Sequence, residues 1–179
     1  HQALSAKRYE LCYRLCIALG QLRATRPALP EVVALSERLA AAPGLPAQLR
    51  ALATILQASD RWQAGEGAAA RDLCDRALEL ARGQKERGPL IDALRMRGMI
   101  ERFSGDARGA IPYLEEALAL ARANSQERVA LVCINLGRSH HLAGNVALAE
   151  RYTLQGLELA QRRRDVWNEG IAIGNLALI

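Results

Sequence analysis

Hydrophobic positions recur along the chain with helical spacing, and glycines interrupt them at regular intervals. The stretch 129–164 shows this most clearly, since an apolar run with helical periodicity reaches Gly144, a second run follows, and a basic cluster ends it. The same order of features occurs twice upstream, in the stretches 90–122 and 51–82. A sequence that repeats at a fixed period predicts an array of similar structural units, here pairs of helices.

The repeat is defined by small residues at fixed distances from each turn. The turn glycines Gly65, Gly105 and Gly144 are separated by 40 and 39 residues. Small side chains allow two antiparallel helices to cross at short distance, and a glycine in the left-handed conformation ends the first helix of each pair. The small positions are Ala58, Gly98 and Gly137 before the turns, then Ala70, Ala110 and Ala149, and finally Ala77, Ala117 and Gly156 after them.

We expect one helical repeat domain over residues 1–179. It comprises a degenerate first helix pair at 4–45, three regular repeats at 46–169, and the first helix of a further repeat at 170–179. A half repeat cannot bury its apolar face alone. We therefore expect either that the native chain is part of a larger protein or that a second copy covers this last helix, which would make a homo-oligomer.

Residues at the turns predict how the second helices begin. Asp106 and Asn145 follow turn glycines and are good N-cap residues, whereas Glu66 at the equivalent position is a poorer one. Pro112 falls inside the second helix of its repeat. Because proline lacks a backbone N–H, it removes a hydrogen bond of the helix, and we expect the helix to bend there.

Composition favours an all-α fold and narrows the kinds of partner. Hydrophobic residues make up 50% of the chain and aromatic residues 4%, with Ala and Leu dominant. No apolar run approaches the roughly 20 residues of a membrane span, and no signal-peptide pattern opens the chain. The net charge is +5, with 22 arginines and two lysines, but acidic residues are interleaved and only Arg162–Arg164 form a run. We therefore expect solvated arginines, and neither a membrane nor nucleic acid as partner.

The candidate metal ligands do not form a site. Cys12 and Cys16 lie four residues apart on one helix face and would need further ligands from elsewhere. Cys133 and His140 are seven residues apart, which is about 10 Å along a helix and too far for one ion. We interpret the cysteines, including Cys74, as small buried hydrophobic residues, and reduced thiols favour a cytoplasmic protein. No catalytic constellation is present, so we expect no metal, no cofactor and no enzymatic activity.

The ladder of small residues and turn glycines resembles the tetratricopeptide repeat, in a longer variant of about 40 residues. The resemblance covers 46–179 closely and 8–45 loosely, and it implies a right-handed α-solenoid of antiparallel helix pairs. The usual Trp and Tyr of the first helix are absent. Their positions hold Thr54, Leu94 and Cys133 for the Trp, and Arg61, Glu101 and His140 for the Tyr.

The resemblance also implies a concave groove lined by the first helix of each repeat. An Asn side chain can pair with a peptide bond, Arg can bind carboxylate or phosphate, and large apolar side chains add adaptable contact area. Alternatively, Asn135 and Asn175 only tie neighbouring repeats together. The groove residues singled out in this way are Trp62, Met96, Met99, Arg102, Phe103, Asn135, Arg138, His141 and Asn175.

Two functions fit this pattern. The first is a scaffold that binds a peptide or a partner protein in the concave groove. The second follows from residues 13–52, which are similar to the segment that opens the repeat region in large bacterial signalling ATPases and transcriptional regulators. That similarity implies a sensor or regulatory segment that binds a small molecule or relays a signal. No GxxxxGK[ST] motif for nucleotide binding occurs in the chain.

Overall fold

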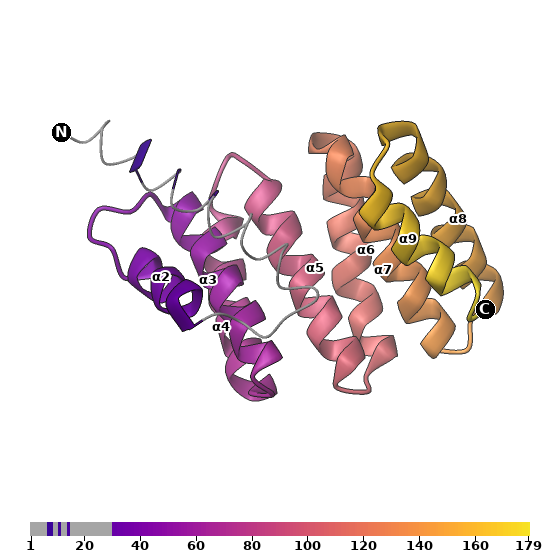
Figure 1. The fold of residues 1–179 in the computed structure, drawn as a ribbon, viewed down its shortest axis with the longest axis horizontal. Helices are drawn as coiled ribbons and strands as arrows, with labels where there is room; N and C mark the ends of the chain where they lie inside the picture. Colours follow the sequence, from indigo (N-terminus) through magenta and orange to yellow (C-terminus); the bar gives the residue numbers. More distant parts are fainter. Residues whose placement is uncertain (1–6, 9–10, 12–13, 15–29) are drawn as a thin grey trace. The chain divides into compact units, whose positions relative to one another are not determined.

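The computed structural model describes residues 7–8, 11, 14 and 30–179, and all regular structure there is helical (Figure 1). This confirms the all-α prediction. The helix predicted within 4–26 lies largely outside the described residues, as do Cys12 and Cys16. The helices are α2 (Pro30–Ala40), α3 (Ala47–Gln63), α4 (Gly67–Arg82), α5 (Gly88–Phe103), α6 (Ala107–Asn124), α7 (Gln126–Leu142), α8 (Val146–Arg163) and α9 (Val166–Leu176).

The chain divides into two compact units, residues 1–96 and residues 97–179, and the boundary falls within α5. In the first unit α2 packs against α3 and α3 against α4. In the second unit α6 packs against α7, α7 against α8, and α8 against α9, while α9 also contacts α7. Contacts between helices that are close in sequence are typical of a helical repeat array. No helix in the described part of the chain is both long and apolar enough to cross a membrane.

The three predicted turn glycines adopt the left-handed conformation. Gly65, Gly105 and Gly144 have φ values of 79°, 93° and 84°. In each turn, the amide of the residue after the glycine donates to the carbonyl five residues earlier, which is the Schellman pattern that satisfies the end of a helix. The donor–acceptor pairs are Glu66 to Arg61 at 2.9 Å, Asp106 to Glu101 at 3.0 Å and Asn145 to His140 at 2.8 Å.

The predicted N-caps have different outcomes. Asp106 caps α6, since its Oδ1 accepts from the amide of Gly109 at 2.7 Å. Asn145 is the N-cap residue of α8, as predicted, but its side chain makes no capping hydrogen bond. Its Nδ2 instead lies 3.3 Å from Nδ1 of His140, a buried ring that needs a polar partner. Glu66 makes no side-chain cap either, as its weaker propensity predicts.

The small-residue ladder mediates close helix contacts inside the second unit. A Cβ added at Gly98 of α5 would lie 2.8 Å from Leu114 Cγ on α6. One added at Gly137 of α7 would lie 2.9 Å from the carbonyl oxygen of Ala149 on α8. These distances leave no room for a side chain, so the packing role expected for the ladder is confirmed. Pro112 lies inside α6, which is continuous on both sides of it.

The described cysteines belong to the core. Cys74 and Cys133 are both fully buried. Burial raises the pKa of the Cys133 thiol to about 11, against a smaller opposite effect of the nearby positive charge of Arg122. The Cys133 thiol is therefore protonated and unreactive at neutral pH, as expected for a small hydrophobic residue.

The last helix begins earlier than the sequence pattern indicated. It starts at Val166 rather than near residue 170, because Oδ1 of Asp165 accepts from the amide of Asn168 at 3.1 Å and caps it. Of its side chains only Ala172 is buried, whereas Trp167 is 61% exposed and Ile173 is 52% exposed.

Candidate functional site

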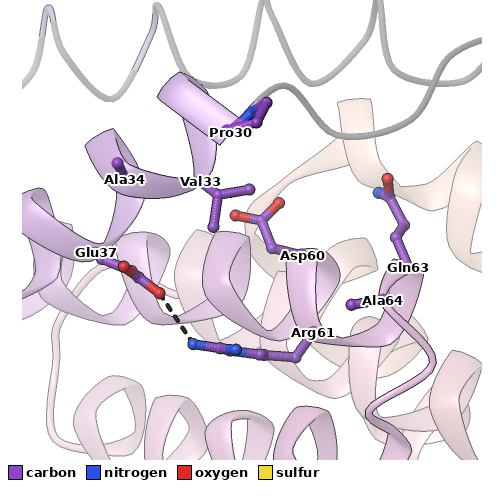
Figure 2. A pocket seen from close by; sticks show the side chains of 8 residues that line it. All are labelled: Pro30, Val33, Ala34, Glu37, Asp60, Arg61, Gln63 and Ala64. Carbon is purple, nitrogen blue, oxygen red and sulfur yellow. Dashed lines mark hydrogen bonds and ion pairs between the residues drawn. The ribbon is translucent and has the colours of Figure 1, made fainter.

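The first unit contains a hollow of about 740 Å³ between α2 and the end of α3 (Figure 2). The lining residues are Pro30, Val33, Ala34 and Glu37 from α2 with Asp60, Arg61, Gln63 and Ala64 from α3 and the turn after it.

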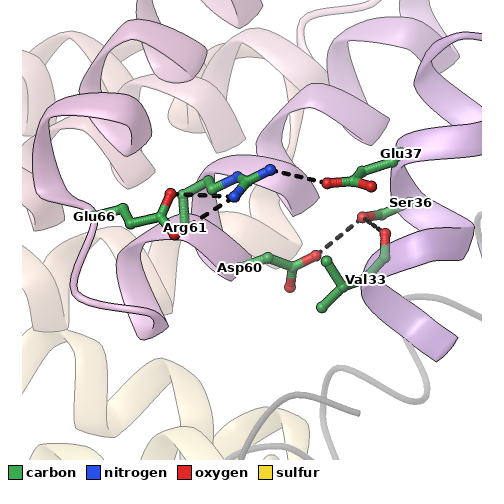
Figure 3. A network of polar contacts seen from close by, with 6 residues as sticks. All are labelled: Val33, Ser36, Glu37, Asp60, Arg61 and Glu66. Carbon is green, nitrogen blue, oxygen red and sulfur yellow. Dashed lines mark hydrogen bonds and ion pairs between the residues drawn. The ribbon is translucent and has the colours of Figure 1, made fainter. Parts of the chain in front are cut away.

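A polar network joins the two helices at this hollow (Figure 3). The Ser36 hydroxyl lies 2.9 Å from Oδ2 of Asp60, and both residues are buried. Arg61 pairs with Glu37 at 3.0 Å and with Glu66 at 3.1 Å. The charged groups here satisfy one another, so we interpret this network as a structural connection between α2 and α3.

Two of the predicted groove residues belong to the first unit. Trp62 is partly exposed, and its Cζ3 lies 3.7 Å from the position of a Cβ at Gly67, so the indole packs over the start of α4. Met96 is only 2% exposed. Its side chain is part of the core, and we leave it out of the candidate surface.

In the second unit, the end of α5 presents an aromatic ring to solvent. Phe103 is 54% exposed, although a phenylalanine is usually buried. The guanidinium carbon of Arg102 lies 4.2 Å from the centre of this ring, a cation–π contact that holds the two side chains together. Met99, one turn earlier on the helix, is partly exposed.

Arg138 and His141 extend the candidate surface onto α7. They are three residues apart on one helix and therefore share a face, and both are partly exposed. Asn135 is only 8% exposed, and its Nδ2 donates to the carbonyl of Leu131 in the same helix at 2.8 Å. The Asn135 amide is therefore partly used within α7, and it keeps one N–H and its carbonyl oxygen for another partner.

The two arginines of this surface influence each other. Burial and, to a smaller extent, the positive charge of Arg138 together lower the pKa of Arg102 to about 10. Neither guanidinium forms an ion pair with any of the described acidic residues. By contrast, Arg97 pairs with Glu101 on the same helix and stacks on the ring of Tyr113.

Three nitrogen atoms of the same surface are buried and lack a hydrogen-bond partner. They are Nε of Arg102, Nη1 of Arg138 and Nδ1 of His141. A buried polar group without a partner costs free energy, so each of these groups would gain from a bound partner such as an ion or a water molecule. We call Arg102, Phe103, Arg138 and His141 the arginine–aromatic surface.

Asn175 has a different environment. Its Nδ2 donates to the carbonyl of Ile134 at 3.4 Å, which links α9 to α7. This contact favours the alternative that Asn175 ties neighbouring repeats together. The Asn135 bond stays within its own helix, so the same interpretation does not extend to Asn135.

The structure also contains features that the sequence did not single out. The Ser36–Asp60 pair joins helices 24 residues apart in sequence, and no short motif identifies it. The proximity of Arg102 and Arg138 likewise depends on two separate helices. Among the described residues, no group of three or more His, Cys, Asp or Glu is arranged to hold a metal ion.

Comparison with known proteins finds a family match over part of the chain and structures with a similar fold. Residues 49–123 match the sequence model of the tetratricopeptide repeat family. No curated protein sequence matches the chain significantly. The structure of aspartyl phosphate phosphatase F from Bacillus subtilis is similar with a TM-score of 0.73 and 15% identity, covering 91% of this chain and 43% of that one. BtubC (BKLC) from P. vanneervenii is similar with a TM-score of 0.68 and 19% identity, covering 98% of this chain and 83% of that one.

These findings confirm the resemblance to tetratricopeptide repeats and the helical repeat fold. The chain spans less than half the length of the phosphatase, and at these identities the likeness is one of fold alone. The similarity of the N-terminal part to large signalling ATPases stays a prediction.

Proposed function

We propose that this chain, whose tetratricopeptide repeats make it a protein-interaction scaffold, binds an extended peptide segment of a partner protein along α5 and α7. The tetratricopeptide repeat is a protein-interaction fold rather than a catalytic one. The arginine–aromatic surface is the part of the second unit that carries the proposal. A role in signalling is a further prediction of the N-terminal similarity.

The observation that carries the proposal is the exposed ring of Phe103, 54% accessible and held in place by Arg102 at 4.2 Å. A rigid aromatic side chain loses little conformational entropy when it binds, so it contributes contact area efficiently. Arg138 and His141 on the next first helix are partly exposed and offer hydrogen-bond donors. A peptide has both apolar side chains and backbone carbonyls to match these groups.

Selection from a random library of 12-residue peptides tests the proposal without knowledge of the natural partner. The affinity of a selected peptide is then measured by fluorescence anisotropy for the original chain and for Phe103→Ala. Loss of an exposed aromatic anchor should weaken binding about tenfold or more. The far-ultraviolet circular dichroism should not change, because Phe103 contributes little to the core.

Leu154→Ala is the matched control. Leu154 is also an exposed apolar residue, 46% accessible, but it lies on α8, a second helix of its repeat. We expect its substitution to leave peptide affinity within a factor of two. Selected peptides that bind Phe103→Ala as tightly as the original chain, or that depend on Leu154 instead, would contradict the proposal.

A further inference from the structure

The arginine–aromatic surface contains two positive charges with no acidic partner among the described residues. Arg102 lies at the end of α5 and Arg138 near the end of α7, and both are partly buried. Some other described arginines of this unit are neutralised locally, for example Arg162 by Glu158 at 2.6 Å and Arg128 by Glu127 at 2.6 Å. The positive charge of Arg138 contributes to the lowered pKa of Arg102, so the two guanidinium groups lie near enough to repel each other unless a negative group lies between them.

The unpaired atoms at this position are all hydrogen-bond donors or can become donors. Nε of Arg102 and Nη1 of Arg138 each carry an N–H, and Nδ1 of His141 carries one in the charged ring or in one neutral tautomer. Three donors from two helices suit a group that has several acceptor oxygens. Arginine is the residue that binds carboxylate and phosphate oxygens most effectively, because its N–H groups form a planar fork.

Charge balance distinguishes between the possible anions. A single carboxylate would neutralise one of the two guanidinium groups and leave the other uncompensated. A phosphoryl group on a side chain carries a charge of about −1.5 to −2 at neutral pH and three acceptor oxygens. It matches both the charge and the number of donors.

We infer that Arg102, Arg138 and His141 form a binding site for a doubly charged oxyanion of the phosphoryl type. The site deepens the proposed function and rests on it for the carrier, since a peptide bound along Phe103 would present the phosphoryl group to the arginines. Free inorganic phosphate shares the same chemistry and would occupy the same position.

The first experiment uses inorganic phosphate alone and does not depend on any peptide. The thermal midpoint of the chain is measured with increasing phosphate, with acetate and with chloride, all at equal ionic strength. At ten times its dissociation constant, phosphate should raise the midpoint by about 3 °C. Acetate should raise it by less than about 1 °C, because it has one charge and two oxygens.

Two variants and one control assign the effect to these residues. Arg102→Met and Arg138→Met should each abolish the specific rise with phosphate. Phosphate also stabilises proteins in general by exclusion from their surface. The double variant Arg102→Met with Arg138→Met measures that general effect. Arg162→Met, which removes an exposed arginine already paired with Glu158, should behave like the original chain. An equal rise in the original chain and the double variant, or an equal rise with acetate and phosphate, would overturn the inference.

A second set of measurements distinguishes free phosphate from a phosphoryl group that is carried on a peptide. A blocked phosphoserine peptide with an adjacent phenylalanine is compared with inorganic phosphate and with the same peptide containing unmodified serine. Tighter binding of the phosphopeptide than of phosphate, lost in Phe103→Ala, supports a peptide-borne group. Equal binding of both supports the anion site while contradicting the peptide proposal. Equal binding of the phosphorylated and unmodified peptides counts against the anion site and leaves the peptide proposal standing.

Discussion

The imidazole ring of His140 lies parallel to the phenol ring of Tyr152, with ring centres 5.4 Å apart and an angle of 6° between the planes. His140 is on α7 and Tyr152 is on α8, so the stack joins the two helices of one repeat. The ring is only 4% exposed, and its Nε2 has no hydrogen-bond partner. His140 occupies the position where the tetratricopeptide repeat usually has Tyr, and the imidazole takes over its packing role.

The buried imidazole predicts a dependence of stability on pH. Burial lowers the pKa of His140 below its ordinary value of 6.5, while Glu115 raises it and Arg151 lowers it to smaller extents. Below pH 6.5 the His140 imidazole is therefore protonated more fully in the unfolded chain than in the folded chain. The free energy of unfolding consequently falls as the pH decreases. Urea unfolding between pH 5 and pH 7.5 should show this slope. The variant His140→Phe keeps the stack but cannot titrate, so its slope should be smaller; an equal slope would exclude His140 as the cause.

Glycines at helix contacts and glycines in open positions should respond oppositely to alanine. A Cβ at Gly137 would meet the backbone oxygen of Ala149 at 2.9 Å, so Gly137→Ala forces the helices apart. We expect a loss of about 1–3 kcal/mol in the free energy of unfolding. Gly174→Ala is the control, because nothing lies within 4 Å of its Cβ position. It should stabilise the chain by about 0.5–1 kcal/mol through helix propensity. Chemical unfolding measures both, and a stabilising Gly137→Ala would contradict the close contact.

Removing one charge from the arginine–aromatic surface should stabilise the protein without its ligand. Burial and Arg138 lower the pKa of Arg102 to about 10, which means that its charged form is disfavoured in the folded state. Arg102→Met keeps an unbranched side chain as far as the position of Nε and removes the charge. We expect a gain of about 1 kcal/mol, reduced by loss of the cation–π contact with Phe103. Arg162→Met should change the stability by less than about 0.5 kcal/mol. A clear loss of stability in Arg102→Met would show that the arginine is a structural element.

The connection between α2 and α3 should depend on the Ser36 hydroxyl. Ser36 is 1% exposed and Asp60 is 5% exposed, and their oxygens are 2.9 Å apart. Ser36→Ala removes one partner of a buried carboxylate, which should cost about 1–2 kcal/mol. Ser59→Ala removes a hydroxyl that accepts a hydrogen bond from the exposed side chain of Gln63 at 3.3 Å, and it should cost little. Thermal unfolding of both variants makes the comparison, and equal midpoints would argue against a structural role for the pair.

The sequence predicted the helices and turns well because these depend on local features. Gly65, Gly105 and Gly144 were identified from spacing alone, and each has the left-handed φ that the turn requires. Asn145 was correctly placed as the N-cap residue of α8, but its side chain lies beside His140, five residues earlier, and makes no capping hydrogen bond. The start of α9 was placed too late, because it was predicted from apolar residues alone. The helix instead begins after Asp165, whose carboxylate caps it.

The candidate site was predicted less completely. Register along a repeat correctly indicated that Arg102 and Arg138 belong to first helices. It could not indicate that their charges act on each other, since that depends on side-chain paths between two helices. It also placed Met96 with the groove residues, whereas the side chain packs in the core at 2% exposure. A shift of one or two residues along a helix turns the direction of the side chain by a large angle. A small error in register is therefore enough to move a predicted groove residue into the core.

The unequal burial of α7 and α9 has a consequence for local unfolding. On α7 ten residues are buried, from Val129 to His140, whereas on α9 only Ala172 is buried. Segments with few buried contacts open with a small free energy, and well-covered ones open only in global unfolding. In native-state hydrogen exchange, the amides of α9 should exchange first and those in the middle of α7 last. The peptide segment that we propose to bind along α5 and α7 would therefore contact the most slowly exchanging helix of the second unit.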